Sequence, residues 1–317
     1  MHRSYLLVAL LAAGCVVAIA QESESAGAPD LPRHQILFAR HSDEARRDYD
    51  IWRICADGTQ MASLVVEPGD QFSVTVSPDG GEFVYASREE GRQDLWRRGF
   101  RGRSSVNLTD HPADDSEPTW SPDGESVAFF SDRDAEKPEL YLLHLEEARI
   151  ERLTEDHFHD AGAAWSPDGS AIVFTRYFPD PEKGEHAGDG EIIRLDLESR
   201  KEERLTELGG YNGSLTYSPD GETIAFHRAA EDRVEIWLMD ADGANPRPIT
   251  DTYIDEYSPA WSPDGNWIVF TAGTGSDGHG TFDLWLMRPD GSDRRLLSAA
   301  ANTEMSPQWR PGEYYCR

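Results

Sequence analysis

The residues best suited to bind a ligand recur at one fixed distance along the chain. Five positions before a repeated aromatic residue (Val76 in the first copy), each copy carries a side-chain oxygen: Gln71, Asp115, Asp160, Asn212, Glu256 and Glu304. Six positions before the aromatic residue or Val76, three copies carry a further polar side chain that belongs to the same candidate set: Asp70, His159 and Asp255. Carboxylate and amide oxygens suit a hard cation such as Ca²⁺ or a basic peptide segment. The spacing predicts a binding ring for one of these ligands. The alternative is that the acids cap turns and pair with nearby arginines.

Basic side chains recur at the same level as the acids. Arg40, Arg176 and Arg228, with Arg88 and Arg133, each follow a short apolar segment. They could pair with the ring acids, or clamp the carboxylates of an acidic sugar or a peptide. His41, His159 and His227 lie at this level on different copies. Three histidines near one opening could hold a metal ion, so a metal-dependent enzyme is a second hypothesis.

A repeated hairpin must position these side chains. Copies of Ser-Pro-Asp-Gly begin at Ser77, Ser121, Ser166, Ser218 and Ser262, and Arg310-Pro311-Gly312 is a degenerate last copy. Complete copies begin about 44–52 residues apart, a spacing typical of propeller blades. Pro and Gly favour the tight turn, and an apolar strand such as Phe83–Tyr85 follows each one. The pattern predicts an all-β fold, a six-bladed β-propeller of four-stranded antiparallel blades.

The two ends of the repeat complement each other. The segment Ile36–Phe38 is a second strand without its hairpin partner, and Gln308–Gly312 is a first strand without its follower. The C-terminal strand is therefore expected to complete the N-terminal blade and to close the ring. This arrangement brings Cys55 near Cys316 and predicts a disulfide, against the alternative of two unpaired thiols.

The N-terminal residues have the pattern of an export signal. Residues 1–20 combine a short basic start, an apolar run and a small-residue cleavage pattern, and residues 21–34 have the composition of a flexible linker. A lipoprotein site at Cys15 is the alternative to simple cleavage. The propeller is expected over residues 35–317 of a periplasmic or secreted protein, without a transmembrane segment. Its formal net charge of −29 disfavours nucleic acid and anionic lipid as partners.

The repeat resembles that of the TolB-type propeller family. The pattern W-S-P-D-G-x-x-I-x-F is matched by Trp120–Phe129, Trp165–Phe174 and Trp261–Phe270, and the resemblance covers about residues 35–312. It implies the propeller fold. The same repeat is the scaffold of accessory binding proteins, of peptidase gating domains and of some polysaccharide lyases, so it specifies function weakly.

The uniform Pro-Asp-Gly turns define one face, and the variable loops define the other, where function is expected. The leading hypothesis is a monomeric, non-enzymatic module that binds an envelope protein or peptide segment in an acidic funnel. The alternative is a carbohydrate-active enzyme, a metal-dependent lyase or hydrolase acting on acidic oligosaccharides. A purely structural scaffold is the third hypothesis.

Overall fold

The structure, a computed structural model, describes residues 31–41, 48–89, 91–134, 136–179, 188–230, 233–273, 281–298, 303–312 and 316. All regular structure in these ranges is β-strand, and they contain no helix. A helix long and apolar enough to cross a bilayer is accordingly not found among them. The expected signal peptide, Cys15 and residues 21–30 of the expected linker lie outside the described residues.

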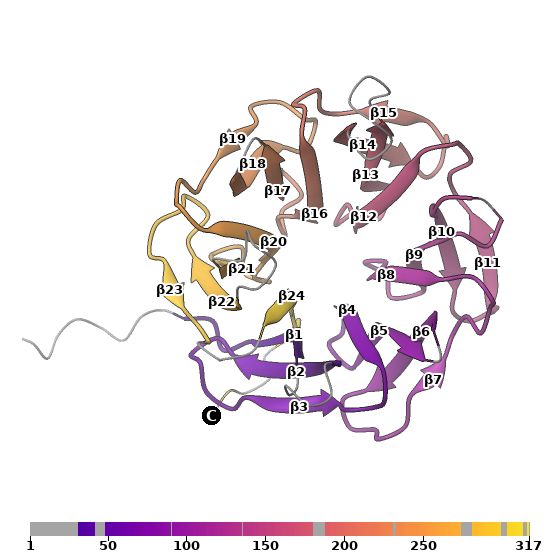
Figure 1. Cartoon of the computed structure of the whole chain (residues 1–317), viewed down its shortest axis with the longest axis horizontal. Coiled ribbons are helices and arrows are strands. Elements are labelled where there is room, and N and C mark those ends of the chain that lie inside the picture. Colours follow the sequence, from indigo (N-terminus) through magenta and orange to yellow (C-terminus); the bar gives the residue numbers. More distant parts are fainter. Residues whose placement is uncertain are drawn as a thin grey trace, which may run out of the picture. The chain divides into compact units, whose positions relative to one another are not determined.

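Four of the sheets contain four antiparallel strands each (Figure 1). Their hydrogen-bonding orders are β24-β1-β2-β3, β4-β5-β6-β7, β11-β10-β9-β8 and β20-β21-β22-β23. The strands of the first two sheets are β24 (Glu304–Trp309), β1 (Gln35–His41), β2 (Tyr49–Cys55), β3 (Ala62–Val65), β4 (Asp70–Val76), β5 (Glu82–Glu89), β6 (Arg92–Gly99) and β7 (Val106–Asn107). The strands of the other two are β8 (Asp115–Trp120), β9 (Ser126–Ser131), β10 (Glu139–His144), β11 (Arg149–Arg152), β20 (Asp255–Trp261), β21 (Ile268–Gly273), β22 (Phe282–Met287) and β23 (Arg295–Leu296).

The remaining strands form one eight-stranded sheet where two separate blades were expected. It contains β12 (His159–Trp165), β13 (Ala171–Pro179), β14 (Gly188–Asp196), β15 (Glu202–Arg204), β16 (Tyr211–Tyr217), β17 (Thr223–Ala230), β18 (Arg233–Asp240) and β19 (Arg247–Pro248). A single parallel pair, Gly190 with Tyr211, joins its two antiparallel halves. Gly190 permits this approach, because a Cβ there would lie 2.6 Å from the Tyr211 ring.

The Pro-Asp-Gly turns have the structure that the sequence predicts. In the first copy, the Ser77 hydroxyl donates to Asp79 Oδ1 at 2.6 Å, and the Gly81 N–H donates to the same oxygen at 2.8 Å. Gly80 has a φ of 67°, in the left-handed region that glycine adopts without strain. The serine–aspartate bond recurs in all the complete copies. These turns are therefore self-contained structural units.

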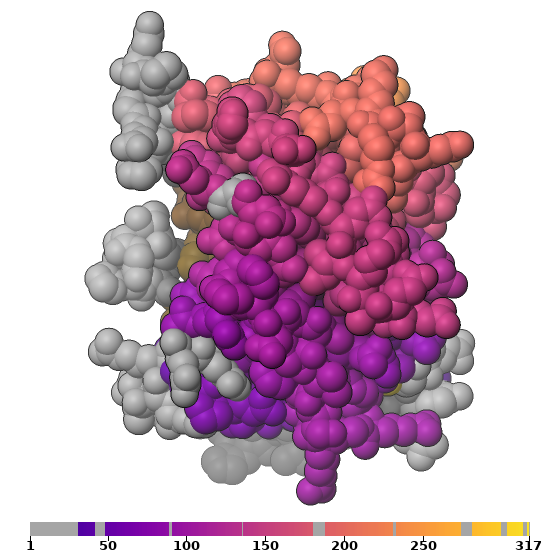
Figure 2. All heavy atoms as spheres, turned by 90° about the vertical axis from the view of Figure 1, so that its right-hand side faces the viewer, coloured from indigo at the N-terminus to yellow at the C-terminus, as the bar shows by residue number. Residues whose placement is uncertain are grey.

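Apolar faces of neighbouring sheets pack against each other to form the core. Val84 of β5, for example, shares a buried cluster with Phe129 of β9 and Tyr141 of β10. In Figure 1 the strands β4, β8, β12, β16, β20 and β24 lie nearest the centre, and each contacts the next in this order, with β24 also contacting β4. The space-filling side view in Figure 2 shows that the atoms of successive parts of the chain, from indigo to orange, pack closely on this side. This arrangement leaves the inner strands facing a central space.

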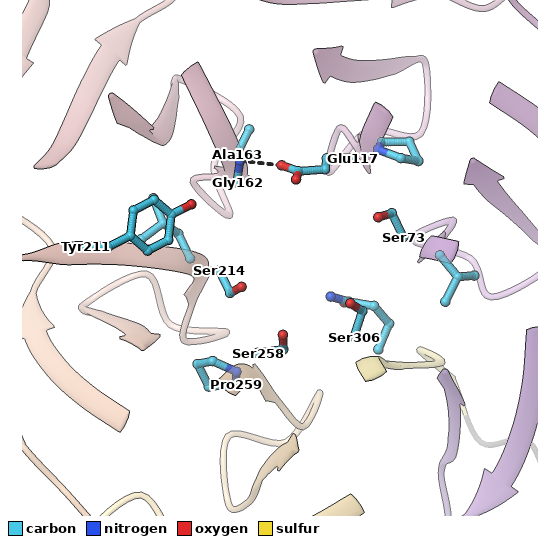
Figure 3. Close-up of a pocket in the computed structure, with 13 residues that line it drawn as sticks. Ser73, Glu117, Gly162, Ala163, Tyr211, Ser214, Ser258, Pro259 and Ser306 are labelled. Atoms are coloured by element: carbon cyan, nitrogen blue, oxygen red, sulfur yellow. Dashed lines mark hydrogen bonds between the residues drawn. The ribbon is translucent and has the colours of Figure 1, made fainter. Parts of the chain in front are cut away.

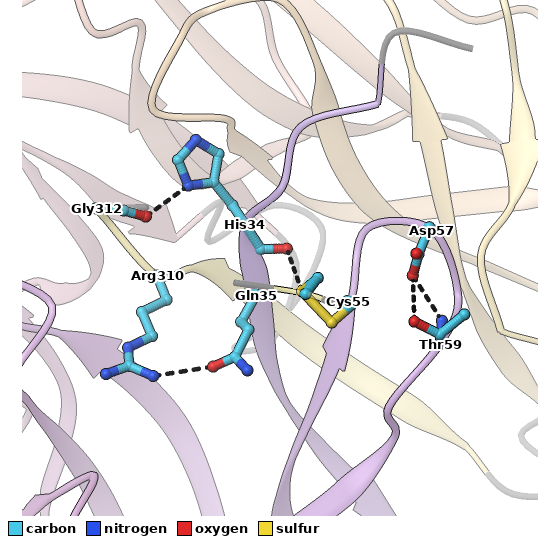
Figure 4. Close-up of a disulfide and its surroundings, with 8 residues drawn as sticks. His34, Gln35, Cys55, Asp57, Thr59, Arg310 and Gly312 are labelled. Carbon is cyan, nitrogen blue, oxygen red and sulfur yellow. Dashed lines mark hydrogen bonds between the residues drawn. A yellow bond between two sulfur atoms is a disulfide. The ribbon is translucent and has the colours of Figure 1, made fainter. Parts of the chain in front are cut away.

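The C-terminal strand joins the N-terminal sheet, as predicted. Strand β24 pairs with β1, and Cys55 at the end of β2 forms a disulfide with Cys316 (Figure 4). Beside it, the Arg310 guanidinium donates to Gln35 Oε1 and to the Gly80 carbonyl, at 2.9 Å each. The disulfide prediction is confirmed, and the two ends of the described unit are held together both covalently and by strand pairing.

Candidate functional site

Each inner strand carries a β-bulge, and the residue at the bulge has a left-handed backbone. These residues are Ser73, Glu117, Gly162, Ser214, Ser258 and Ser306, with φ between 51° and 66°. The register shifts in each case between this strand and the next one outward. Bulges redirect side chains. Here they place one residue of every inner strand at the central space.

These residues line a cavity of about 150 Å³ (Figure 3). Hydroxyl-bearing side chains from four of the inner strands point into it, and Tyr211 and Gln308 complete its polar wall. The other lining residues are Val74, Pro118, Ala163, Leu215 and Pro259. We call this space the axial cavity. Among the described residues that line it, Glu117 alone can carry a negative charge at neutral pH.

Glu117 accepts a hydrogen bond of 2.6 Å from the Gly162 N–H across the boundary between β8 and β12. Its side chain reaches solvent in the cavity, but the walls surround it. This enclosure raises the pKa of Glu117, and the Gly162 bond acts in the opposite direction. Burial and the nearby Glu117 charge raise the pKa of Tyr211 to about 12, so its hydroxyl keeps its proton at neutral pH.

The ring of side-chain oxygens predicted from the sequence lies elsewhere. Its six members are all 0% exposed: Gln71, Asp115, Asp160, Asn212, Glu256 and Glu304. Four of them are carboxylates, and each contacts an arginine: Arg133, Arg176, Arg294 and Arg40, in order. Gln71 and Asn212 donate to the carbonyls of Gly69 and Gly190, at 2.7 Å each. These side chains belong to the interior of the blades, where they hold loops and arginines in place.

The neighbouring acids and Arg228 of the prediction also make internal contacts. Asp70 and Asp255 accept hydrogen bonds from the backbone N–H groups of Tyr49 and Val234 in the preceding sheet, at 3.1 and 3.2 Å. Arg228 donates to the Leu208 carbonyl at 2.8 Å. These bonds connect successive strand groups, which is a structural role.

The predicted histidines do not come together. His159 is exposed at the start of β12, whereas His41 makes an edge-to-face contact with the Tyr49 ring. His227 is 7% exposed and packs between the rings of Tyr211 and Tyr257, with centroid distances of 5.7 and 5.3 Å. Burial lowers the pKa of His227 to about 4, so it is neutral at physiological pH.

Among the described residues, one group of acidic side chains has the spacing of a metal site: Glu139, Asp156 and Asp160. No histidine belongs to this group. Arg176 contacts both aspartates, and Arg152 contacts Glu139 at 3.1 Å. Guanidinium groups thus occupy the positions that would neutralise these carboxylates, which disfavours a metal ion there.

Exposed acids lie on the loops that lead from an outer strand to the next inner strand. Asp110, Glu155, Glu207 and Asp251 are all exposed, and each follows a Leu-Thr or Ile-Thr pair. Because inner strands begin and outer strands end on the same face of an antiparallel blade, these acids share a face opposite to the Pro-Asp-Gly turns. We call them the rim acids. Tyr253, which is 100% exposed, lies on the same loops.

Sequence reasoning missed both the bulge residues and the rim acids. The bulge residues stand three positions before each repeated aromatic or Val76, and they read Ser, Glu, Gly, Ser, Ser, Ser. A run of small residues with one glutamate was visible at this position. The rim acids follow a repeated threonine just after the outer strand in four of the copies.

A family model for the TolB β-propeller domain matches residues 51–178 and 185–315. The chain belongs to this family. The TolB of Acinetobacter baumannii matches 95% of this chain with a TM-score of 0.77 and 26% identity, and the match covers 72% of that TolB chain. The TolB resemblance that the repeat indicated is therefore confirmed.

Two other known proteins are similar to parts of this TolB-family chain. An uncharacterized protein of Agrobacterium fabrum is 35% identical over 82 residues, and the match spans 26% of this chain and 28% of that protein. An oligogalacturonate lyase of Vibrio parahaemolyticus is 17% identical with a TM-score of 0.52, over 82% of this chain and 72% of the lyase. The likeness to the lyase shows a shared fold and nothing further.

Proposed function

We propose that this chain is an exported, non-enzymatic binding protein of the cell envelope, and that it holds a protein or peptide segment on the face that carries the rim acids. It would do so as a monomer with six blades, in which β24 closes the ring. The structural disulfide fits an oxidising compartment outside the cytosol. The single observation that carries the binding role is the contrast between the exposed rim acids and the buried, arginine-paired acids.

A basic peptide segment is the partner whose charge complements this face. The rim acids are spread over several blades, so they would attract an extended segment through many weak contacts and not through one pocket. Asp110 and Asp251 form ion pairs with exposed arginines, Arg92 and Arg233, at 3.3 Å each. Such exposed pairs contribute little stability, so a partner can compete for these acids at small cost.

The test compares two variants with the same change of net charge. The triple variant D110N/E155Q/D251N removes rim acids, and E125Q/E146Q/E222Q removes exposed acids from the Pro-Asp-Gly face. Binding of an array of synthetic 15-residue peptides, about half of them basic, is measured by fluorescence anisotropy at about 0.15 M salt. We expect a subset of basic peptides to bind the wild type and the control variant, and to bind the rim variant at least about tenfold more weakly.

Equal binding to both triple variants, or binding to neither variant nor the wild type, would contradict the proposal. The enzyme alternative has its own measurement, the absorbance of unsaturated product from oligogalacturonides with Mn²⁺. A Mn²⁺-dependent product would replace the binding role with a lyase activity.

A further inference from the structure

Glu117 is the acid of the inner strands that lines the axial cavity. Asp115, only two residues earlier on β8, is bound in a bidentate manner by Arg133 at 2.7 and 2.8 Å. Within the described part of the chain, Glu117 has no lysine, arginine or histidine at ion-pair distance, and its only hydrogen bond comes from the Gly162 N–H. The same strand thus carries a compensated acid in the blade and an uncompensated acid in the axial cavity.

The rest of the axial cavity offers hydrogen-bond acceptors. The hydroxyls of Ser73, Ser214, Ser258 and Ser306 have no hydrogen-bond partner among the described residues, and they face the same space as Glu117 (Figure 3). The Tyr211 hydroxyl also points into this space. Glu117 is exposed to the solvent of this cavity, so a cationic group that enters the cavity can reach its carboxylate.

We propose that the axial cavity binds a primary ammonium group, either a lysine side chain or a free amino terminus of a peptide, through the carboxylate of Glu117. This inference rests on the proposed peptide-binding function and names the group that enters the centre of the face.

The chemistry of the wall favours an ammonium over the other common cations. An ammonium group has three N–H donors, which match one carboxylate oxygen and two hydroxyls. A guanidinium prefers a planar, bidentate carboxylate partner, but Glu117 Oε2 already accepts the Gly162 N–H. Ca²⁺ takes six to eight oxygen ligands, commonly with several carboxylates, and this cavity supplies a single carboxylate.

Binding is expected to depend on pH through Glu117. The titratable groups that line the cavity are Glu117 on β8 and Tyr211 on β16, since the other lining side chains do not ionise. Burial raises the pKa of Glu117, and a bound ammonium would favour the charged carboxylate, so binding is linked to proton release across the titration of Glu117. Affinity is therefore expected to rise with pH through the titration of Glu117.

The experiment uses the mature chain and short synthetic probes in isothermal titration calorimetry. Ac-Gly-Lys-Gly-NH2 is compared with the norleucine analogue, and Gly-Gly-Gly-NH2 with its N-acetylated form, so that the two sources of the ammonium are separated. We expect the charged peptide of one pair to bind the wild type, and its neutral analogue to bind at least about tenfold more weakly. The affinity of the charged peptide for E117Q should be reduced by a similar factor. Titrations in buffers of different ionisation enthalpy are expected to show proton release on binding.

E125Q, an exposed acid on the opposite face, is the matched control and should leave the affinity unchanged. Thermal unfolding of E117Q is measured alongside, because a folded variant is required for the comparison. Equal affinity for charged and neutral probes, or unchanged affinity in E117Q, would overturn the inference. Saturation by Ca²⁺ that depends on Glu117 and excludes the peptides would also overturn it.

Failure here is distinguishable from failure of the proposed function. If the rim variant loses basic peptides while E117Q keeps them, the binding face stands and the ammonium site does not. If no basic peptide binds the wild type, the proposed function itself fails.

Discussion

The disulfide between Cys55 and Cys316 gives the most quantitative prediction. The cysteines are 261 residues apart, so the bond closes a loop that contains most of the chain. In the chain-entropy model, such a loop removes about 19 cal/mol/K from the unfolded ensemble, or about 5.5 kcal/mol at 25 °C. Measured effects of disulfides are typically 2–4 kcal/mol, and we expect the loss in the double variant C55A/C316A to lie between about 2 and 5 kcal/mol.

Alanine is chosen at both positions because Cys55 is 0% exposed, and a serine hydroxyl there would add a separate burial cost. The assay is guanidinium unfolding followed by tryptophan fluorescence, with the wild type measured oxidised and after reduction. The reduced wild type serves as the matched control, since it lacks the bond but keeps both sulfur atoms. We expect it to unfold at nearly the same midpoint as the variant.

If the double variant and the reduced wild type both unfold at the midpoint of the oxidised wild type, this reasoning is refuted. It would mean that strand pairing alone holds the C-terminal segment. The candidates for that role are the β24–β1 pairing and the hydrogen bond of 2.9 Å from the Trp309 indole to the Ala260 carbonyl. A slope that differs between oxidised and reduced protein would show instead that the disulfide compacts the denatured state.

Three further predictions concern stability. R176M leaves the fully buried Asp160 without its bidentate partner, so urea unfolding should show a loss of about 3–5 kcal/mol, most of which the double variant R176M/D160N recovers. The hydrogen bond from the Ser166 hydroxyl lowers the pKa of Asp168 to about 2. The ionised Asp168 therefore stabilises the fold when the pH is above the ordinary pKa of an aspartate, and this stabilisation is lost as the pH falls to about 2. The Tm of D168N should change less between pH 7 and pH 2 than the Tm of the wild type. The pKa of His227 is lowered to about 4, so between pH 6.5 and pH 4 the unfolded chain binds a proton that the folded chain does not. The free energy of unfolding should therefore decrease as the pH is lowered from 6.5 to 4. This decrease should be smaller in H227Q.

The strands, and the pairing of the N-terminal with the C-terminal strand, could be predicted from the sequence. The Pro-Asp-Gly turns set the register of each hairpin locally, and the incomplete copies around Ile36 and Trp309 could be satisfied only by each other. The disulfide followed from that pairing. These features depend on short-range turn chemistry and on counting, both of which a single sequence carries.

The site was harder because the inner strands do not alternate regularly. Counting from Trp120 placed Asp115 at the channel, but the bulge at Glu117 interrupts the alternation and directs Glu117 to the cavity and Asp115 into the blade. The arginine that compensates Asp115 comes from the loop after the next strand, a pairing that the sequence offered as the alternative to a binding ring. A left-handed serine or glutamate has no strong signature, whereas a glycine such as Gly162 does.

The bulges also have an evolutionary consequence. Each inner strand contributes a single bulge residue to the axial cavity, and the apolar clusters between sheets are built from other residues. A point mutation at Ser73, Ser214 or Ser258 therefore changes the lining of the cavity while the packing of the blades stays intact. Chains with this fold can diverge in what they bind through a handful of codons, and the bulge positions are where such divergence should be sought first.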